Sequence, residues 1–580
     1  MSTAAINSAL SSIFAIQKQM NLASANIANA DVEGYTSKSV KVTTTVSGGT
    51  GTGVTTSVAT SSVDSYLLKD IAAAISNAGD ADTANSYYDA LQRLFGSVST
   101  GDDTGSDLSS LLSNLSDAVN NLAGTPDSSA YKEAVVTALD DVAAELRSTS
   151  AGIQDLRTQA DEEISEKVDE VNTALDQIAA LNVQIRTAKA AGESTADLED
   201  QRMTALQTVA SDIDVNYFVD QYGNMQIYTA GNQILVDSSS ARHLSHTAST
   251  LSSSLTYEGG GIDGITLNGV DITDQISTGS IAALIEQRDT VLTNAQSELD
   301  NLAATLGTTV NAIFNSGTAS PPSSSLTGTA DVSASDAVTV ESGTTIRVAI
   351  TDSDGNLVSS TDLDLSSATT VADVAAALST VSGVTASVVD GHLSVSVADD
   401  QGIALQTVSG SVDGTDISSA FGLNDVLTDS SSAATIAIRS DLLTSPDSLA
   451  SGTLSSTLTV GDTAVGASDA TVAEALSDAL TGKTSFSAAG WLGSSNTTFT
   501  SYAASIISSV ATRADAASDA ATNLDATLST LQSQFSDQSG VNVDNETAKL
   551  AELQNAYAAS AQILSVLQSM FDSLMNAVQG

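Results

Sequence analysis

Histidine is the side chain that most often moves protons at neutral pH, and this chain has three: His243, His246 and His392. His243 and His246 lie three positions apart, so they could share a metal ion on one turn of a helix. No third histidine is near them in the sequence, and the chain has no cysteine that could complete a zinc site. We therefore expect both residues to lie on the surface, in a polar loop.

Two other segments match ligand-binding motifs by composition. Segment 259–264 has the spacing G-x-G-x-x-G, but the residues after it predict a strand and a turn, whereas a dinucleotide site needs these glycines to open a helix. Asp352, Asp354 and Asn356 are spaced like calcium ligands, yet the glycine is out of register and Leu363 stands where a bidentate glutamate would be. We expect a flexible loop at the first segment and a hairpin turn at the second.

The remaining acidic pairs, such as Asp399-Asp400 and Glu162-Glu163, are typical of solvated faces rather than of acid/base couples. The sequence contains neither the G-x-S-x-G pattern of hydrolases nor a P-loop. Trp491, the single tryptophan, fits an anchor of a local core better than a ligand site. We predict that the protein is not an enzyme, with no catalytic residues, no cofactor and no metal site.

The clearest pattern is structural, a narrow apolar stripe at heptad spacing near the C-terminus. Its members follow alternating steps of three and four residues, and one of the nine is polar. This spacing is typical of a coiled coil. The stripe comprises Leu550, Leu553, Tyr557, Ser560, Leu564, Leu567, Phe571, Leu574 and Val578.

The N-terminal segment carries a similar stripe, made of Ile6, Leu10, Ile13, Gln17, Met20, Ser24 and Ile27. An isolated helix is only marginally stable in water, because most of its stability comes from packing an apolar face. We therefore expect the two ends to pair with each other and with copies of themselves. The assembly contacts that we predict are Ile6, Leu10, Ile13, Met20, Ile27, Leu550, Leu553, Tyr557, Leu564, Leu567, Phe571 and Leu574.

Composition excludes several classes of partner. The 19 Lys and Arg residues against 69 Asp and Glu give a net charge of -50, which argues against nucleic acid and anionic membranes as ligands. No run approaches the roughly 20 apolar residues that cross a bilayer, so we expect no membrane insertion. The first 30 residues also lack the basic start and unbroken apolar run of a cleavable signal peptide.

Between the two ends, helical and strand-like periodicities alternate. A long helical pattern runs from Val135 to Ile185, where Gly152 is a possible bend, and a Gly/Thr-rich stretch at 48–53 predicts a flexible loop. We predict a multidomain α+β protein with terminal coiled-coil helices, an elongated α-helical bundle and inserted β-rich outer domains. The expected divisions are a terminal helix and turn (1–45) that pairs with a C-terminal helix (540–580), a bundle in three parts (46–210, 279–320 and 497–539) and two β-rich insertions (211–278 and 321–496).

Both ends also carry family motifs. Near the N-terminus these are Asn26, Ile27, Ala28 and Asn29, followed by Gly34 and Tyr35, and near the C-terminus they lie in segments 540–544 and 549–564. Together they resemble the ends of bacterial flagellar axial proteins, the family of rod, hook and hook-associated proteins. The long helical region 108–206 and segment 279–315 are most similar to the hook-associated group at the hook–filament junction.

The resemblance implies a structural adaptor of the bacterial flagellum that is needed for filament assembly and motility. It implies that the terminal helices form an inner tube and that the chain leaves the cell through type III export without a cleaved signal peptide. The implied partners are copies of itself, the hook protein, other hook-associated proteins and a cytoplasmic export chaperone. The alternatives are the hook protein itself, a secreted acidic adhesin or surface-layer protein, and a secreted hydrolase hidden in an insertion.

Overall fold

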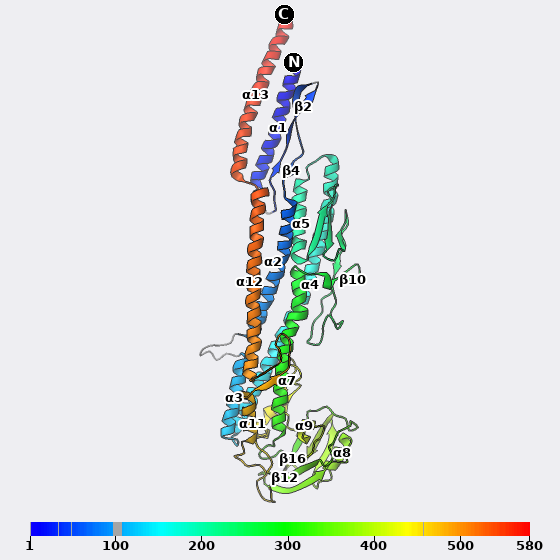
Figure 1. Cartoon of the computed structure of the whole chain (residues 1–580), viewed down its shortest axis with the longest axis vertical. Coiled ribbons are helices and arrows are strands. Elements are labelled where there is room, and N and C mark those ends of the chain that lie inside the picture. Colours follow the sequence, from blue (N-terminus) through cyan, green and yellow to red (C-terminus); the bar gives the residue numbers. More distant parts are fainter. Residues whose placement is uncertain (1, 33, 48, 97–106, 456, 580) are drawn as a thin grey trace.

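The computed structural model describes residues 2–32, 34–47, 49–96, 107–455 and 457–579. The molecule is a long rod with both termini at one end and a β-rich lobe at the other (Figure 1). Long helices pair along the rod and small antiparallel sheets are inserted between them, so the predicted fold class is confirmed. Within the described ranges, no helix has both the length and the apolarity needed to cross a bilayer.

Ten helical segments, one of them a π-helical turn, build the rod. They are α1 (Ser2–Ala28), α2 (Ser65–Phe95), α3 (Leu108–Gly124), α4 (Ser129–Ala191), α5 (Ala196–Asp212), α6 (Ser280–Glu286), the π-helical turn η2 (Gln287–Val291), α7 (Leu292–Asn315), α12 (Phe499–Ser539) and α13 (Val543–Gln579). The shorter helical segments are η1 (Thr273–Gln275), α8 (Val371–Leu378), α9 (Ile417–Phe421), α10 (Ser440–Thr444), η3 (Pro446–Ser448) and α11 (Thr471–Thr481).

Helix α4 is the backbone of the rod. The side chain of Ser128 caps its first turn, and Gly192 ends it in the left-handed conformation with φ 71°. Its 63 residues form one continuous helix of about 95 Å, so the possible bend at Gly152 is not a break. A Cβ atom at Gly152 would lie 2.6 Å from a methyl carbon of Leu94, so this glycine lets α2 pack closely against α4.

The strands form small antiparallel sheets, and their bounds follow the chain. Those before residue 280 are β1 (Lys38–Ser39), β2 (Val42–Ser47), β3 (Thr50–Thr56), β4 (Thr60–Ser61), β5 (Val215–Val219), β6 (Met225–Thr229), β7 (Ile234–Val236), β8 (Leu244–Ser245), β9 (Thr266–Leu267) and β10 (Val270–Asp271). The later strands are β11 (Ser325–Thr327), β12 (Thr345–Asp352), β13 (Leu357–Asp364), β14 (Thr385–Val389), β15 (His392–Ser396), β16 (Gln401–Ser409), β17 (Leu427–Thr428), β18 (Ala437–Ile438), β19 (Thr484–Phe486) and β20 (Ser495–Thr497).

The prediction of a flexible loop at 48–53 is wrong for the residues of this stretch that the structure describes. Strand β3 begins at Thr50 and pairs with β2 in a hairpin that packs on α1, while residue 48 lies outside the described residues. A Cβ atom at Gly53 would lie 2.5 Å from the Ser11 hydroxyl, and the Val54 amide donates to that hydroxyl. The glycine in this stretch therefore allows a strand to approach a helix closely.

Two large hydrophobic cores and one small apolar cluster are formed by the described residues. The larger runs through the bundle, which comprises α2 to α7, α11 and α12, and it includes the sheet β5-β6-β7 that lies on α4. Residues 326–423 build a separate core, here named the distal lobe, around α8 and the sheets of β12 and β15. Most buried residues between 426 and 486 contribute to the bundle core instead, whereas Leu454 and Ala464 form the small cluster with Ala349, Leu357 and Ala404 of the distal lobe. The segment predicted as one insertion, 321–496, is thus shared between the two cores.

Candidate functional site

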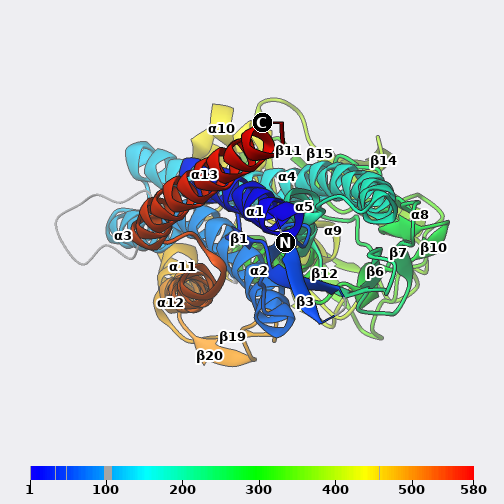
Figure 2. The same cartoon turned by 90° about the horizontal axis from the view of Figure 1, so that it is seen from above.

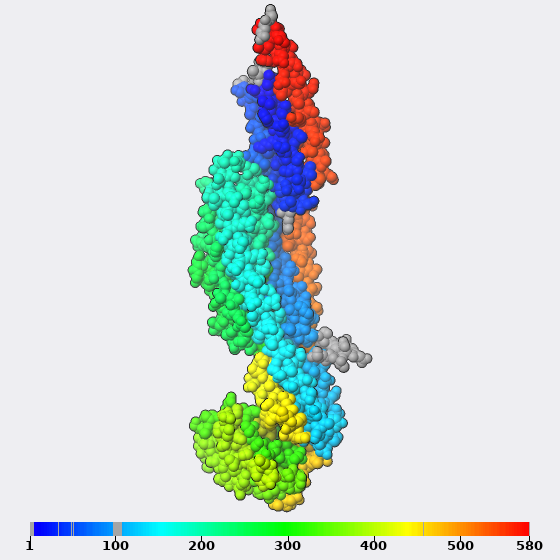
Figure 3. Space-filling view, turned by 180° about the vertical axis from the view of Figure 1, so that it is seen from behind, coloured from blue at the N-terminus to red at the C-terminus, as the bar shows by residue number. Residues whose placement is uncertain are grey.

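The two terminal helices form an antiparallel pair at one end of the rod, here named the terminal pair (Figures 1 and 2). α13 packs mainly against α1, and it projects with α1 beyond the bundle as a narrow stalk (Figure 3). Along α13 the half-buried positions repeat at heptad spacing and coincide with the first part of the predicted stripe. The stripe positions are Leu550, Leu553, Tyr557, Ser560, Leu564 and Leu567, and the neighbouring Lys549 and Ala561 are half-buried as well.

On α1 the predicted stripe is buried to different depths. Ile13 is buried, whereas Ile6, Met20 and Ile27 are half-buried and Leu10 is 40% exposed. The Gln17 amide nitrogen lies 3.4 Å from the Tyr557 hydroxyl, so members of the two predicted stripes meet. The opposite side of α1 packs on β3, which gives this helix two neighbours.

The far end of α13 is different, because its apolar residues have no partner within the described chain. Phe571, Leu574 and Val578 continue the stripe but are 42%, 64% and 79% exposed. The Gln17–Tyr557 contact sets the antiparallel register, from which α13 extends past the first residue of α1 beyond about position 572. The structure therefore brings the predicted α13 residues up to Leu567 against α1, and leaves Phe571 and Leu574 open to solvent.

The N-terminal family motif is built into the joint between the terminal pair and the bundle. Asn26 is fully buried, and its side-chain amide bonds both backbone groups of Lys38, donating to the carbonyl at 3.0 Å and accepting from the N–H at 3.1 Å. The Tyr35 hydroxyl donates to the same Asn26 oxygen at 3.1 Å. This asparagine fixes how the chain turns after α1. Ile27 and Ala28 end α1, and the side-chain amide of Asn29, just beyond the helix, donates to the Ala25 carbonyl at 2.9 Å.

Lys38 carries the connection onward to α5. Its ammonium group lies 2.8 Å from a carboxylate oxygen of Asp197 and 2.9 Å from one of Asp200, while its side chain is 3% exposed. The same nitrogen lies 3.4 Å from the centre of the Tyr35 ring. Burial alone would lower the pKa of Lys38, but hydrogen bonds and attraction from both carboxylates outweigh burial and raise it. Asn26, Tyr35, Thr36, Lys38, Asp197 and Asp200 are named the neck cluster below.

Two further features hold the neck. Gly34 has φ 74°, and a Cβ atom there would lie 2.7 Å from the Thr204 hydroxyl, so this position favours glycine on both grounds. The Ser37 amide donates to the Ser539 carbonyl at 2.7 Å, which ties the outgoing chain after α1 to the end of α12. Both connections between the terminal pair and the bundle therefore meet in one place.

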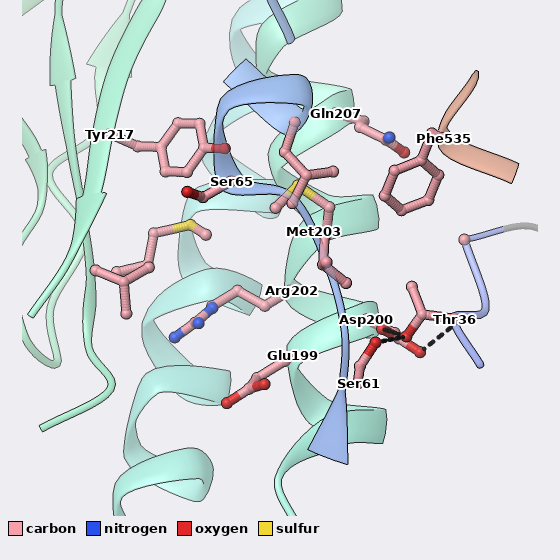
Figure 4. A pocket seen from close by; sticks show the side chains of 15 residues that line it. Thr36, Ser61, Ser65, Glu199, Asp200, Arg202, Met203, Gln207, Tyr217 and Phe535 are labelled. Atoms are coloured by element: carbon pink, nitrogen blue, oxygen red, sulfur yellow. Dashed lines mark hydrogen bonds between the residues drawn. The ribbon is translucent and has the colours of Figure 1, made fainter. Parts of the chain in front are cut away.

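Beside the neck lies a cavity of about 320 Å³, here named the shoulder cleft (Figure 4). It is bounded by the turn after α1, the start of α2, one face of α5, the hairpin of β5 and β6, and Phe535 of α12. Apolar and polar side chains line it in similar numbers, and Asp200 accepts hydrogen bonds from the amide and hydroxyl of Thr36. No local pattern in the sequence marks this cleft, because its walls come from five separate segments.

The structure corrects one prediction about the histidines. His243 is half-exposed beside Asp176, but the side chain of His246 is fully buried and lies 3.0 Å from Asp161, which also binds Arg288. His246 is thus part of a buried ionic network rather than of a surface loop. Among the described residues, no group of three or more His, Asp or Glu side chains is placed to hold a metal ion.

The predicted hairpin at 352–357 is confirmed as the turn between β12 and β13.

Comparison with known families places three flagellar signatures along the chain. Residues 91–326 match the family described as the flagellar hook-associated protein FlgK helical domain. Residues 6–36 match the flagella basal body rod protein family, and residues 532–577 match the C-terminal family of the flagellar basal body rod FlgEFG proteins. The resemblance predicted from the motifs at both ends is confirmed.

Curated relatives agree with these matches. The chain is 26% identical over 320 residues to flagellar hook-associated protein 1 of Escherichia coli (strain K12), which covers 54% of this chain and 57% of the relative. It is 22% identical over 348 residues to the protein of the same name from Bacillus subtilis (strain 168), covering 54% and 67%. The match thus spans less than two thirds of the length of the Escherichia coli relative. The solved flagellar hook junction protein FlgK from Burkholderia pseudomallei superposes with a TM-score of 0.48 at 17% identity, covering 80% of this chain and 99% of that one.

Proposed function

We propose that this chain, as a flagellar axial protein of the hook-associated protein 1 kind, is a structural adaptor at the hook–filament junction. In this role it is needed for filament assembly. In this proposal the terminal pair packs against the terminal pairs of neighbouring copies, and the distal lobe faces outward. The match of residues 91–326 to a hook-associated helical domain favours this role over that of the hook protein.

The observation that carries the proposal is the unpartnered apolar end of α13. Met570, Leu574 and Val578 are 63%, 64% and 79% exposed, and Phe14 of α1, nearer the middle of the same stalk, is 61% exposed. Fully burying one such side chain contributes about 1.5–3 kcal/mol. Exposed apolar surface gathered on one narrow element is typical of an interface between proteins.

The distribution of charge supports the same conclusion. The whole chain carries a net charge of -50, yet Lys18 is the sole charged residue between positions 2 and 30, and Asp572 is the sole one from 553 to 580. Like charges that are brought together repel strongly, so a very acidic chain assembles most easily through a part that is nearly neutral. The terminal pair is that part.

The proposed partners are copies of itself, the hook protein and other hook-associated proteins. We also propose a cytoplasmic export chaperone that covers the C-terminal stripe, because an exposed apolar stripe promotes aggregation. The same proposal places the working protein outside the cell, delivered by type III export. A terminal pair that depends on neighbours for part of its stability is compatible with passage as an unfolded chain.

The experiment that tests the proposal replaces Leu574 by Asp in cells where this is the sole copy of the protein. Leu574 is 64% exposed, so the change leaves the fold of the solitary chain intact but places a charge in the proposed interface. We expect few or no filaments in electron micrographs, and little of the variant in isolated hook–filament structures. Val460→Asp is the matched control, because Val460 is 74% exposed and the amide of the next residue, Gly461, donates to the Leu357 carbonyl of the distal lobe, far from the terminal pair. Normal filaments with Leu574→Asp would contradict the proposal.

A further inference from the structure

Each helix of the terminal pair carries a lone charge in its neutral stretch. Lys18 is the sole charged residue between positions 2 and 30, and Asp572 is the sole one from 553 to 580. Both side chains are exposed. Among the described residues neither has an ion-pair partner, although the Lys18 ammonium group donates to the Ser57 carbonyl at 2.8 Å. The two stretches therefore offer one positive and one negative charge on surfaces that are otherwise neutral.

These two charges cannot pair within one chain. The Gln17–Tyr557 contact sets the antiparallel register of the terminal pair, so Lys18 is level with residue 556 of α13. Asp572 lies about 16 residues, or about 24 Å, farther from the neck. If neighbouring copies cover the stalk, each charge leaves water, and a buried charge without a partner costs free energy. Both charges therefore need a partner from another copy.

The surroundings of Lys18 form a surface that is basic and apolar. The Ser57 amide donates to the Lys41 carbonyl and the Lys41 amide donates to the Ser57 hydroxyl, so both lysines lie beside this serine. Lys41 is exposed. Phe14, one turn from Lys18 on α1, is 61% exposed, and Val42 and Val58 are 38% and 40% exposed. This surface is named the basic corner and comprises Phe14, Lys18, Lys41, Val42 and Val58.

The surroundings of Asp572 are acidic and apolar in the same way. Met575 follows Phe571 by four positions and Asp572 by three, so it neighbours both on the helix surface. Phe571 and Met575 are 42% and 43% exposed. These three residues are named the acidic tip. Each of the two surfaces thus combines exposed apolar side chains with charge of the opposite sign, an arrangement that fixes the register between partners.

We propose that the acidic tip of one copy binds the basic corner of the next copy, with the Asp572 carboxylate beside the ammonium groups of Lys18 and Lys41 and Phe571 against Phe14. This inference rests on the proposed function, to which it adds the two surfaces and their register. In Figure 2 α13 and β3 flank α1 from opposite sides, so one copy can present both surfaces to two different neighbours.

The register has a geometric consequence. To bring Asp572 of one copy level with Lys18 of the next, the two copies must be displaced by about 24 Å along the rod. The contact is head-to-tail, because it uses different surfaces on the two partners. Since every contact adds the same displacement, the copies form a rising helical array rather than a flat ring.

Zero-length cross-linking with a carbodiimide tests this contact, because the reagent joins an amine to a carboxylate only where the two touch. In isolated hook–filament structures, mass spectrometry should find Asp572 linked to Lys18 or Lys41. Lys18 and Asp572 of one chain are about 24 Å apart, so their link must join two copies, and it should be missing from the dilute purified chain. The link between Lys38 and Asp197, 2.8 Å apart in each chain, is the positive control in both samples. Assembled structures that give the control link but none from Asp572 to either lysine would overturn the inference, and would leave the proposed function standing.

Charge reversal tests the same pair in cells. Asp572→Lys adds a third positive charge beside two lysines and should lower the number of filaments per cell at least about tenfold, since like charges across an interface repel. Adding Lys18→Glu and Lys41→Glu to this variant should restore filaments. Glu552→Lys is the matched control, because it makes the same change of charge at an exposed position of α13 outside the acidic tip. Equal loss of filaments with Glu552→Lys, or no recovery in the triple variant, would contradict the proposed pairing.

Discussion

Replacing Lys38 by Met should loosen the neck without unfolding the bundle. Lys38 is 3% exposed and its two carboxylate partners differ, since Asp200 is 13% exposed and Asp197 is 73% exposed. The exposed Asp197 contributes at most about 1 kcal/mol, as surface ion pairs do. Loss of one partner from a buried pair costs about 3–5 kcal/mol. Because Asp200 keeps its two hydrogen bonds from Thr36, we expect Lys38→Met to destabilise the neck by the lower end of this range, about 3 kcal/mol.

Hydrogen–deuterium exchange measures this effect where it arises. The Ser37 amide donates to the Ser539 carbonyl and the Lys38 amide donates to Asn26, so both report on opening of the neck. A loss of about 3 kcal/mol should speed their exchange by about 100-fold if the neck opens as a local unit. Amides in the middle of α4 should keep their protection, because the bundle has its own core.

The control for this prediction is Lys41→Met, which removes the same charge from an exposed position close by in the sequence. We expect Lys41→Met to change exchange at the neck very little. Equal acceleration in both variants would show that net charge, not the neck cluster, controls the joint. Unchanged exchange at Ser37 and Lys38 in Lys38→Met would refute the role given to the buried ammonium group.

Three further outcomes follow from the described contacts. Burial raises the pKa of Glu298 to about 7, although hydrogen bonds from Trp491 and Leu492 act to lower it. Burial likewise raises the pKa of Asp212 to about 6, although the nearby Lys167 acts to lower it. A carboxyl whose pKa is higher in the folded state binds its proton more tightly there, so the free energy of unfolding should rise as pH falls from about 7.5 to 5, and Glu298→Gln should flatten this rise in urea titrations. Gly34→Ala should destabilise the neck by about 1–3 kcal/mol, seen as faster proteolysis between α1 and β1, because of its positive φ and the nearby Thr204 hydroxyl. Leu564→Asp should separate α13 from α1 even in the solitary chain, which circular dichroism would register as lost helix while the bundle stays folded.

Periodicity predicted the helices that bury one face along their whole length. The stripe on α13 is visible in the sequence because its spacing is regular, and it is half-buried in the structure at the same steps from Leu550 to Leu567. The hairpin turn predicted at Asp352, Asp354 and Asn356 also lies where it was expected, between β12 and β13. In these elements the local pattern and the tertiary packing require the same residues.

Contacts between segments that are distant in the sequence produce no comparable sequence pattern. Lys38 meets Asp200 across 162 positions, and neither residue stands in a pattern that marks a buried pair. His246 reads as a loop residue, and it does lie in a loop, but Asp161 and Arg288 bury it from two other elements. The stretch around Gly53 predicts a flexible loop, whereas Gly53 allows a strand to pack closely on Ser11 of α1. The sequence alone does not distinguish such a glycine from one in a loop.

The most direct test of the account compares hydrogen–deuterium exchange of residues 571–578 in the dilute purified chain and in isolated hook–filament structures. These residues are exposed at the end of α13, so we predict rapid exchange in the dilute chain and strong protection after assembly, while α4 is protected in both states. Equal protection of residues 571–578 in the two states would contradict the claim that the terminal pair is completed by neighbouring copies.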